Sequence, residues 1–198
     1  MSLVRFQPVA KASYESEKPF FMPEMIIKDL QNGDLLFMRD KSDFSKAIVE
    51  ATQTYSHVGI YFDGMLYHAS RKRGVAKQKL EEYLKEEDRE IFVYRYPEIE
   101  CESVKNRAEK YLGCSYNHTF YPDNATFYCS QYIAEILPIF KTVPMKFGND
   151  EEEISDFWEN YFQELGVAVP LGLPGTNPGQ LAMCKKLKFL GKLNFTKS

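Results

Sequence analysis

The stretch Phe127-Tyr-Cys-Ser-Gln-Tyr-Ile133 decides the fold, because it places a cysteine in the first turn of a predicted helix. We expect Asn124 or Thr126 to cap this helix, whose apolar residues recur on one face. The positive end of a helix dipole and the unpaired N–H groups there stabilise a thiolate. The sequence therefore predicts that Cys129 is reactive and has a lowered pKa.

Two histidines lie upstream, on a predicted β-hairpin. The segments 56–62 and 65–69 alternate like strands and are joined by Asp63-Gly64, a strong signal for a two-residue hairpin turn. If the residues flanking this turn pair, His57 and His68 are offset by two positions. They then lie on the same side of the sheet and reach a common cleft.

These side chains suit nucleophilic catalysis. An imidazole can hold a thiol as a thiolate–imidazolium pair and then protonate a leaving amine, while a third polar group fixes its tautomer. Cys129 is thus the candidate nucleophile, His57 the base and His68 the orienting group. The backbone N–H of Cys129 is the expected oxyanion donor, with Tyr116 or Tyr55 as candidates for a second.

The rest of the chain predicts an α+β fold in which an antiparallel sheet packs against helices. Its 198 residues are 44% hydrophobic and 27% charged, which suits one globular domain. We expect an N-terminal arm over residues 1–24 and a single catalytic domain over 25–198. Strands are expected at 34–38 and 91–96, and helices at 25–30, 42–51, 80–84 and 103–112, with an amphipathic helix around 157–162.

Composition excludes several classes of protein. A net charge of -3 argues against a nucleic-acid surface, and no apolar run is long enough to cross a membrane. Four cysteines are too sparse for a disulfide scaffold. No secretory signal is visible, which favours the cell interior over export. The sequence indicates no oligomeric state.

Several motifs in order carry a family resemblance. They are Gly33-Asp-Leu-Leu-Phe37, Ser56-His-Val-Gly-Ile-Tyr61, Gly113-Cys-Ser-Tyr116, Pro122-Asp-Asn124, Tyr128-Cys-Ser-Gln131 and Gly175-Thr-Asn-Pro178. Residues 25–182 resemble the circularly permuted NlpC/P60 cysteine hydrolases of the YiiX/YebB-like group. This resemblance implies a permuted papain-like fold with the nucleophile at a helix N-terminus and the histidine-bearing strands before it in the chain.

The resemblance also implies roles and alternatives. Cys129 would attack an amide or isopeptide bond, with cell-wall-derived peptides as one candidate substrate, His57 as base, His68 as third group and no cofactor. His68 stands where many members look to have glutamate. A histidine at this third position is similar to the pattern of the permuted lecithin:retinol acyltransferase-like branch. A lipid-directed thiol acyltransferase is therefore one alternative. A non-enzymatic zinc protein, with Cys129, His57 and His68 as ligands, is another.

Overall fold

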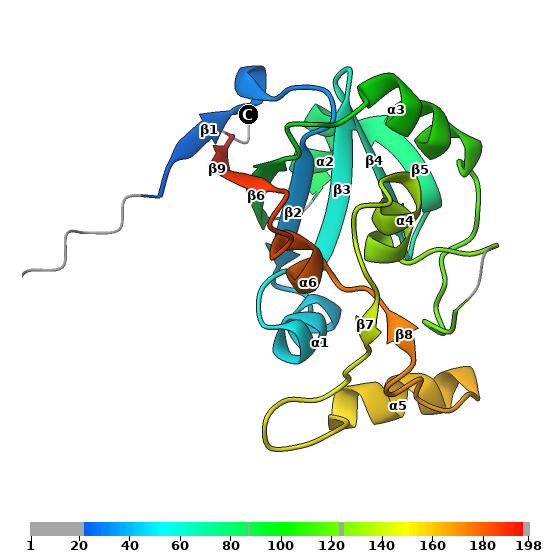
Figure 1. Ribbon diagram of the computed structural model, residues 1–198. Helices are drawn as coiled ribbons and strands as arrows, with labels where there is room; N and C mark the ends of the chain where they lie inside the picture. Colours follow the sequence, from blue (N-terminus) through cyan, green and yellow to red (C-terminus); the bar gives the residue numbers. More distant parts are fainter. Residues whose placement is uncertain (1–21, 87, 123–124, 196–198) are drawn as a thin grey trace, which may run out of the picture.

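A computed structural model describes residues 22–86, 88–122 and 125–195, so most of the expected arm 1–24 lies outside the described residues. Figure 1 shows the arrangement of the elements. The strands are β1 Glu24–Ile26, β2 Leu35–Asp40, β3 His57–Phe62, β4 Met65–Ser70, β5 Gly74–Lys79, β6 Arg89–Arg95, β7 Val143–Pro144, β8 Pro174–Gly175 and β9 Lys188–Asn194. The helices are α1 Asp43–Thr52, α2 Leu80–Glu86, α3 Cys101–Lys110, α4 Cys129–Ile136, α5 Asp156–Leu165 and α6 Pro178–Ala182, with a 3-10 turn at Ile27–Asp29.

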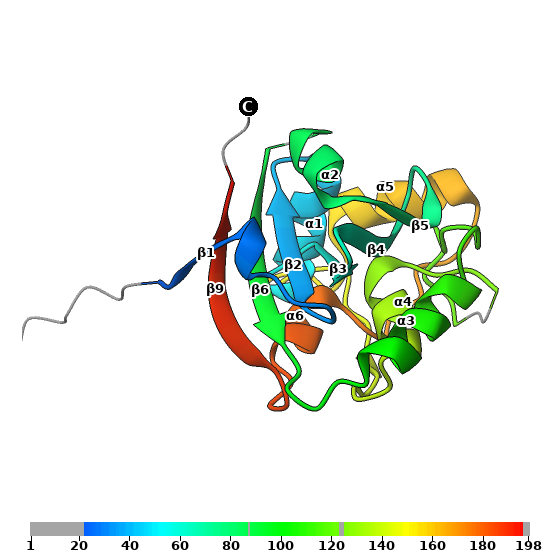
Figure 2. The same ribbon diagram turned by 90° about the horizontal axis from the view of Figure 1, so that it is seen from above.

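Seven strands form the main sheet, in the order β1-β9-β6-β2-β3-β4-β5. The paired neighbours are antiparallel, except that β1 runs parallel to β9. Figure 2 shows β1 and β9 at the edge of the sheet farthest from α3 and α4. The mixed architecture confirms the predicted α+β class.

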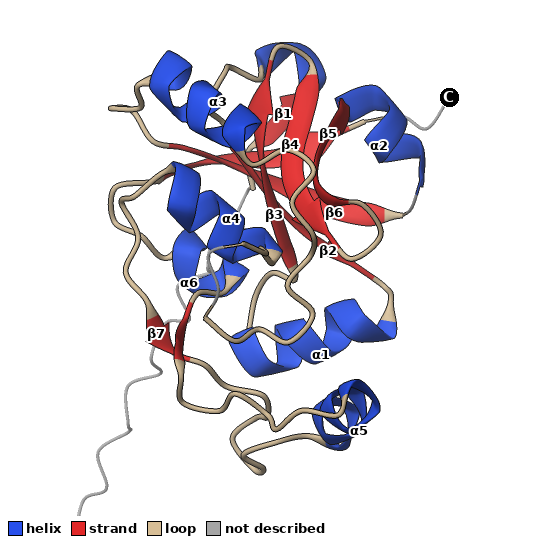
Figure 3. Cartoon of the chain, turned by 90° about the vertical axis from the view of Figure 1, so that its right-hand side faces the viewer, coloured by secondary structure: helices blue, strands red, loops and turns tan. Residues whose placement is uncertain are grey.

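Both faces of this sheet are covered, which explains why its central strands are apolar throughout. Along β2, Leu35 and Phe37 pack in one cluster with residues of α3 and α4, while Leu36 and Met38 pack in another with residues of α2. This follows from the two-residue period of a strand. In Figure 3, α3 and α4 lie on one side of the sheet and α2 on the other.

The predicted hairpin has the expected register. Phe62 pairs with Met65 and Ile60 with Tyr67. Asp63 and Gly64 both have positive φ angles, 50° and 79°, as a tight turn matched to the strand twist requires. The helix predicted from residue 42 is also present, because the Ser42 side chain accepts a hydrogen bond from the N–H of Ser45.

Three local expectations are wrong. Residues 24–26 form β1 rather than the start of a helix, because β9 provides a pairing partner that is remote in the sequence. Helix α3 begins at Cys101 rather than at residue 103, and the Ser103 hydroxyl accepts a hydrogen bond from Arg107. Helix α4 starts directly after Tyr128, so Thr126 is not its cap, and Asn124 lies outside the described residues.

The amphipathic helix predicted near residue 157 is α5, and its aromatic face is buried. Trp158 and Phe162 pack with Phe147 and with Phe44 of α1. Figure 1 places α5 beside the small β7–β8 sheet, below the main sheet. Of the helices described, none is long and apolar enough to cross a membrane.

Candidate active site

Cys129 is the first residue of α4, as predicted. The Gln131 side chain accepts a hydrogen bond from the backbone N–H of Tyr128 and so holds the helix start, a 3.3 Å contact. The Tyr128 hydroxyl accepts another from the N–H of Thr176, which joins this turn to the segment before α6. The helix N-terminus is therefore fixed from two directions.

The sulfur of Cys129 is buried and surrounded by backbone donors. The cysteine is 5% exposed, and the N–H groups of Val58, Ser130 and Cys129 itself hydrogen-bond to the sulfur. Burial outweighs these donors and raises the pKa of the Cys129 thiol to about 11. The predicted lowering of this pKa is wrong, because removal of water disfavours the thiolate more than the helix start stabilises it.

The two histidines meet as the hairpin register predicted. The distance between His57 Nε2 and His68 Nδ1 is 2.9 Å. Burial lowers the pKa of His57 well below 6.5, and the neighbouring His68 and Arg89 lower it further. Burial also lowers the pKa of His68 to about 4. Both rings are therefore neutral at pH 7, and one donates a proton to the other.

Gln78 of β5 indicates which ring donates. Its amide nitrogen donates to Glu86 at 3.2 Å, so the amide oxygen points the other way. Gln78 Oε1 and His68 Nε2 are both buried without a hydrogen-bond partner. Burial lowers the pKa of His68, and the Gln78 side chain acts in the opposite direction, as an acceptor near that ring does. A proton on His68 Nε2 would give both atoms a partner. In that tautomer His68 Nδ1 accepts from His57 Nε2, and His57 Nδ1 carries no proton, as a candidate base requires.

The backbone on both sides of His57 contacts Cys129. The Ser56 carbonyl oxygen lies 4.0 Å from the Cys129 sulfur, and the N–H of Val58 hydrogen-bonds to the same sulfur. Among the described residues, no hydrogen bond joins a ring nitrogen of His57 to this sulfur. Catalytic hydrogen bonds often form or tighten only in the substrate complex. The lack of a direct His57–Cys129 side-chain hydrogen bond among the described residues is therefore compatible with His57 as a base.

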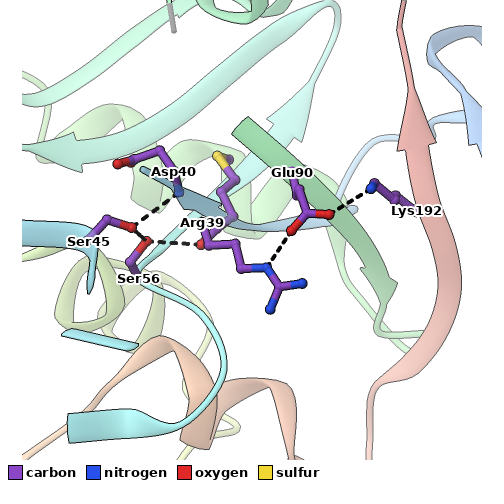
Figure 4. Close-up of polar contacts among 7 residues, drawn as sticks. Arg39, Asp40, Ser45, Ser56, Glu90 and Lys192 are labelled. Atoms are coloured by element: carbon purple, nitrogen blue, oxygen red, sulfur yellow. Dashed lines mark hydrogen bonds and ion pairs between the residues drawn. The ribbon is translucent and has the colours of Figure 1, made fainter. Parts of the chain in front are cut away.

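Ser56 is held by a buried hydrogen-bond network that the sequence did not reveal (Figure 4). Its hydroxyl accepts from Ser45 of α1 and donates to the carbonyl of Met38 at 3.3 Å. The Ser45 hydroxyl in turn accepts from the N–H of Asp40 at 3.2 Å. The network therefore joins the end of β2, the start of α1 and the residue directly before His57.

Figure 4 also shows two ion pairs that share one carboxylate and link β2, β6 and β9. Glu90 of β6 binds Arg39 of β2 at 2.6 Å and Lys192 of β9 at 2.7 Å. These side chains are partly exposed, so each pair contributes little on its own. The two pairs link side chains of three neighbouring strands, β2, β6 and β9.

The two tyrosines proposed as oxyanion donors differ in position. The Tyr55 hydroxyl is 3.1 Å from the hydroxyl of Tyr94, and its ring packs against Phe37 and Phe92 in the core. Tyr116 lies at the cavities beside Cys129, and burial raises the pKa of its hydroxyl well above the usual value, with the neighbouring Cys129 raising it further. Tyr116 therefore stays a candidate donor, whereas Tyr55 lines neither of those two cavities.

Two cavities meet at the candidate site. One, of about 340 Å³, contains Cys129, and the other, of about 270 Å³, contains His57 and His68. Ser56 and Tyr116 line both of them. The candidate nucleophile and the candidate base thus lie in two adjoining cavities. Sequence reasoning missed both, because their walls come from segments that are far apart in the chain.

The described residues contain no group of three or more His, Cys, Asp and Glu side chains placed to hold a metal ion. His57 and His68 direct one ring nitrogen each at the other, which removes those nitrogens as ligands for a shared ion. The arrangement therefore does not support the zinc alternative, in which both histidines and Cys129 were to be ligands.

Comparisons with known proteins identify the family of this chain. A search of curated proteins found no match. A solved structure described as metalloprotein yiiX from Escherichia coli O157:H7 is 22% identical, with a TM-score of 0.64 over 82% of this chain and 97% of that chain, and so shares the fold. The family model for permuted papain-like amidases, YaeF/YiiX, C92 family, matches residues 29–191. The chain therefore belongs to this family of permuted papain-like amidases.

Proposed function

We propose that this protein is a cysteine amidase that cleaves an amide bond through a thioester on Cys129. The observation that supports this most is the setting of the sulfur. It lies at the start of α4, receives three backbone N–H groups, and contacts the backbone on both sides of His57. Such donors favour negative charge that develops at the sulfur and at the attacked carbonyl.

In the first step, the Cys129 sulfur attacks the carbonyl carbon of the substrate as its proton moves to His57 Nδ1. The S–C bond forms and the carbonyl oxygen becomes negative. The N–H of Cys129, with Tyr116 as the candidate second donor, would stabilise that oxygen. The protonated His57 then gives its proton to the leaving nitrogen, and the C–N bond breaks to release an amine.

In the second step, water attacks the thioester. His57 accepts a proton from the water, the C–S bond breaks, and the proton returns to the Cys129 sulfur as the carboxylic acid leaves. His68 accepts a hydrogen bond from His57 throughout and therefore orients its ring. The net reaction is hydrolysis of the amide to an acid and an amine.

The pKa directions favour a neutral starting state. The pKa of Cys129 is raised to about 11 and that of His57 is lowered, so a neutral thiol and a neutral imidazole are preferred at pH 7. The thiolate–imidazolium pair expected from the sequence is therefore not the resting form. Proton transfer accompanies attack instead, and the backbone donors lower its cost.

Acylation with p-nitrophenyl acetate tests the proposal without knowledge of the natural substrate. We expect a burst of p-nitrophenolate and a hydroxylamine-sensitive acetyl group on Cys129, found by mass spectrometry of peptides. Cys129→Ala should abolish the burst and His57→Ala should slow it by about 100-fold or more. Cys184→Ala is the matched control and should behave like the wild type. A burst that survives in Cys129→Ala would refute the assignment of the nucleophile.

A further inference from the structure

The cavity that contains the histidines is lined by charged side chains, whereas the cavity that contains Cys129 presents mainly apolar surface. Four basic side chains line the histidine cavity, against two acidic ones, Asp40 and Glu86. Glu86 is the last residue of α2, and its side chain is 37% exposed. Gln78 of β5 lies between this carboxylate and the buried histidine pair, so Glu86 is in a position to influence the rings without touching the substrate.

One oxygen of Glu86 receives two hydrogen bonds. Arg73 Nη2, from the turn between β4 and β5, donates to Glu86 Oε1 at 2.9 Å, and Gln78 Nε2 donates to the same oxygen at 3.2 Å. A guanidinium can only donate, and an ionised carboxylate can only accept. The donor and acceptor roles at Glu86 are therefore fixed, and the Gln78 amide must turn its NH₂ group towards the carboxylate.

This orientation passes along the chain of polar groups to His57. With its NH₂ group on Glu86, the Gln78 amide presents Oε1 at its other end, and both this oxygen and His68 Nε2 are buried without another partner. A proton on His68 Nε2 gives each of them one. His68 Nδ1 then accepts from His57 Nε2 across 2.9 Å, so the His57 Nδ1 atom carries no proton.

The opposite order of donors would disable the base. If the Gln78 amide were reversed, its NH₂ group would donate to His68 Nε2, and His68 Nδ1 would donate to His57 Nε2. The proton of His57 would then sit on Nδ1, which could not accept the proton of Cys129. The amide and the two rings form equally many hydrogen bonds among themselves in either order, so these three groups alone do not select one. The reversed amide would, however, direct its oxygen at the carboxylate of Glu86, acceptor against acceptor.

We propose that Glu86 is a positioning residue that, through Gln78 and His68, selects the tautomer of His57 able to act as a base. Arg73 assists by holding the accepting oxygen of Glu86. This inference rests on the proposed function, because the tautomer matters only if His57 takes the proton of Cys129. In a Ser-His-Asp triad the carboxylate contacts the catalytic histidine directly. Here the carboxylate lies on α2 and acts through an amide and a second ring.

NMR of protein labelled with ¹⁵N-histidine tests the proposal directly, because the shifts of the ring nitrogens show which of them carries a proton. The chain has only three histidines, so His57→Gln and His118→Gln identify the signals. We expect the proton of His57 on Nε2 in the wild type. Glu86→Lys replaces the acceptor by a donor and should move that proton to Nδ1. Glu86→Gln keeps an oxygen that Arg73 can hold and should retain the wild-type pattern.

Glu82→Lys is the matched control. It makes the same change of charge on the same helix, at an exposed residue that lines neither cavity, and should leave the ring protons in place. A wild-type His57 with its proton on Nδ1 would overturn the inference without recourse to any variant. An unchanged His57 tautomer in Glu86→Lys would overturn it as well.

The p-nitrophenyl acetate burst connects the tautomer to catalysis. Glu86→Lys should slow acylation of Cys129 by about 100-fold or more, because a histidine in the wrong tautomer cannot act as the base. Glu86→Gln should remain within about threefold of the wild type, the usual effect of replacing a charged acceptor by a neutral one. Full activity of Glu86→Lys with the His57 proton on Nδ1 would overturn the inference. Absence of acylation in the wild type, with the expected tautomer observed, would overturn the proposed function instead.

Discussion

At the scale of single residues, the chemistry depends on where three protons reside. In the proposed mechanism, Gln78 would fix the proton of His68, His68 would fix that of His57, and the remaining His57 nitrogen would accept the proton of Cys129. The family resemblance points to the last three of these residues. Gln78 carries no motif signal, because its role depends on β5 lying beside β4.

Substitution of Gln78 tests this order of protons. Gln78→Ala removes the acceptor for His68 Nε2, so both tautomers become available and kcat should fall by about tenfold. Gln78→Glu restores an acceptor and adds negative charge, which raises the histidine pKa values and moves the acid limb of the pH–kcat profile to higher pH. Gln163→Ala, on the exposed side of α5, is the control. If Gln78→Glu leaves the acid limb in place, Gln78 has only a structural role.

The pH dependence of catalysis follows from the lowered pKa of His57. A base acts while it is neutral, and an unperturbed histidine would be half protonated near pH 6.5. Burial lowers the His57 pKa well below that value. We therefore expect kcat/KM for p-nitrophenyl acetate to hold between pH 7 and about pH 6. A decline by half near pH 6.5 would show that the ring is not desolvated in solution.

At the scale of elements, the start of β3 carries the site, because His57 is its first residue and Ser56 precedes it. Hydrogen bonds to Ser45 and to the Met38 carbonyl hold Ser56 between α1 and β2. These groups are buried, so their loss leaves polar atoms without partners.

Ser56→Ala should lower the free energy of unfolding by about 1–3 kcal/mol, since the Ser45 hydroxyl loses its acceptor. It should also slow acylation, because the backbone beside His57 is less firmly held. Urea unfolding and the p-nitrophenyl acetate burst measure the two effects. Thr54→Ala, at an exposed position two residues earlier, should change neither. A wild-type unfolding curve for Ser56→Ala would contradict the role given to this network.

At the scale of the whole molecule, the buried histidines link stability to pH. The pKa of His68 is about 4 in the folded protein and about 6.5 when unfolded, so the unfolded chain binds more protons between these values. The contribution of His68 to the free energy of unfolding is therefore fully present above pH 6.5. It is lost as the pH decreases toward 4, and it amounts to about 3 kcal/mol at most.

Urea unfolding at several pH values between 7 and 4.5 measures this loss. His68→Gln should flatten the dependence, because glutamine does not titrate. His118→Gln is the matched control, since His118 is only partly buried and its protonation is less restricted by the fold. Equal slopes for the wild type and His68→Gln would show that the buried ring does not couple to folding.

The sequence by itself determined the central hairpin and several helices, and it named the candidate residues of the site. Strand alternation and the Asp63-Gly64 turn predict the hairpin and the meeting of His57 with His68, since side-chain period and turn type act over short distances. The helix that begins at Cys129 follows from its apolar face and the family resemblance. Only the tertiary structure decided the raised pKa of that cysteine, because burial arises when remote segments pack.

The two cavities at the candidate site were also decided only by the tertiary structure. The apolar one is walled by segments from residue 48 to residue 183, and the basic one by residues of β4, β5 and α2 among others. No local pattern encodes such a wall, because each residue contributes through its position in the folded chain rather than through its neighbours in sequence. The sequence therefore determined which groups are available for the chemistry, and the packing of distant segments decided the solvation of the thiol and the polarity on each side of it.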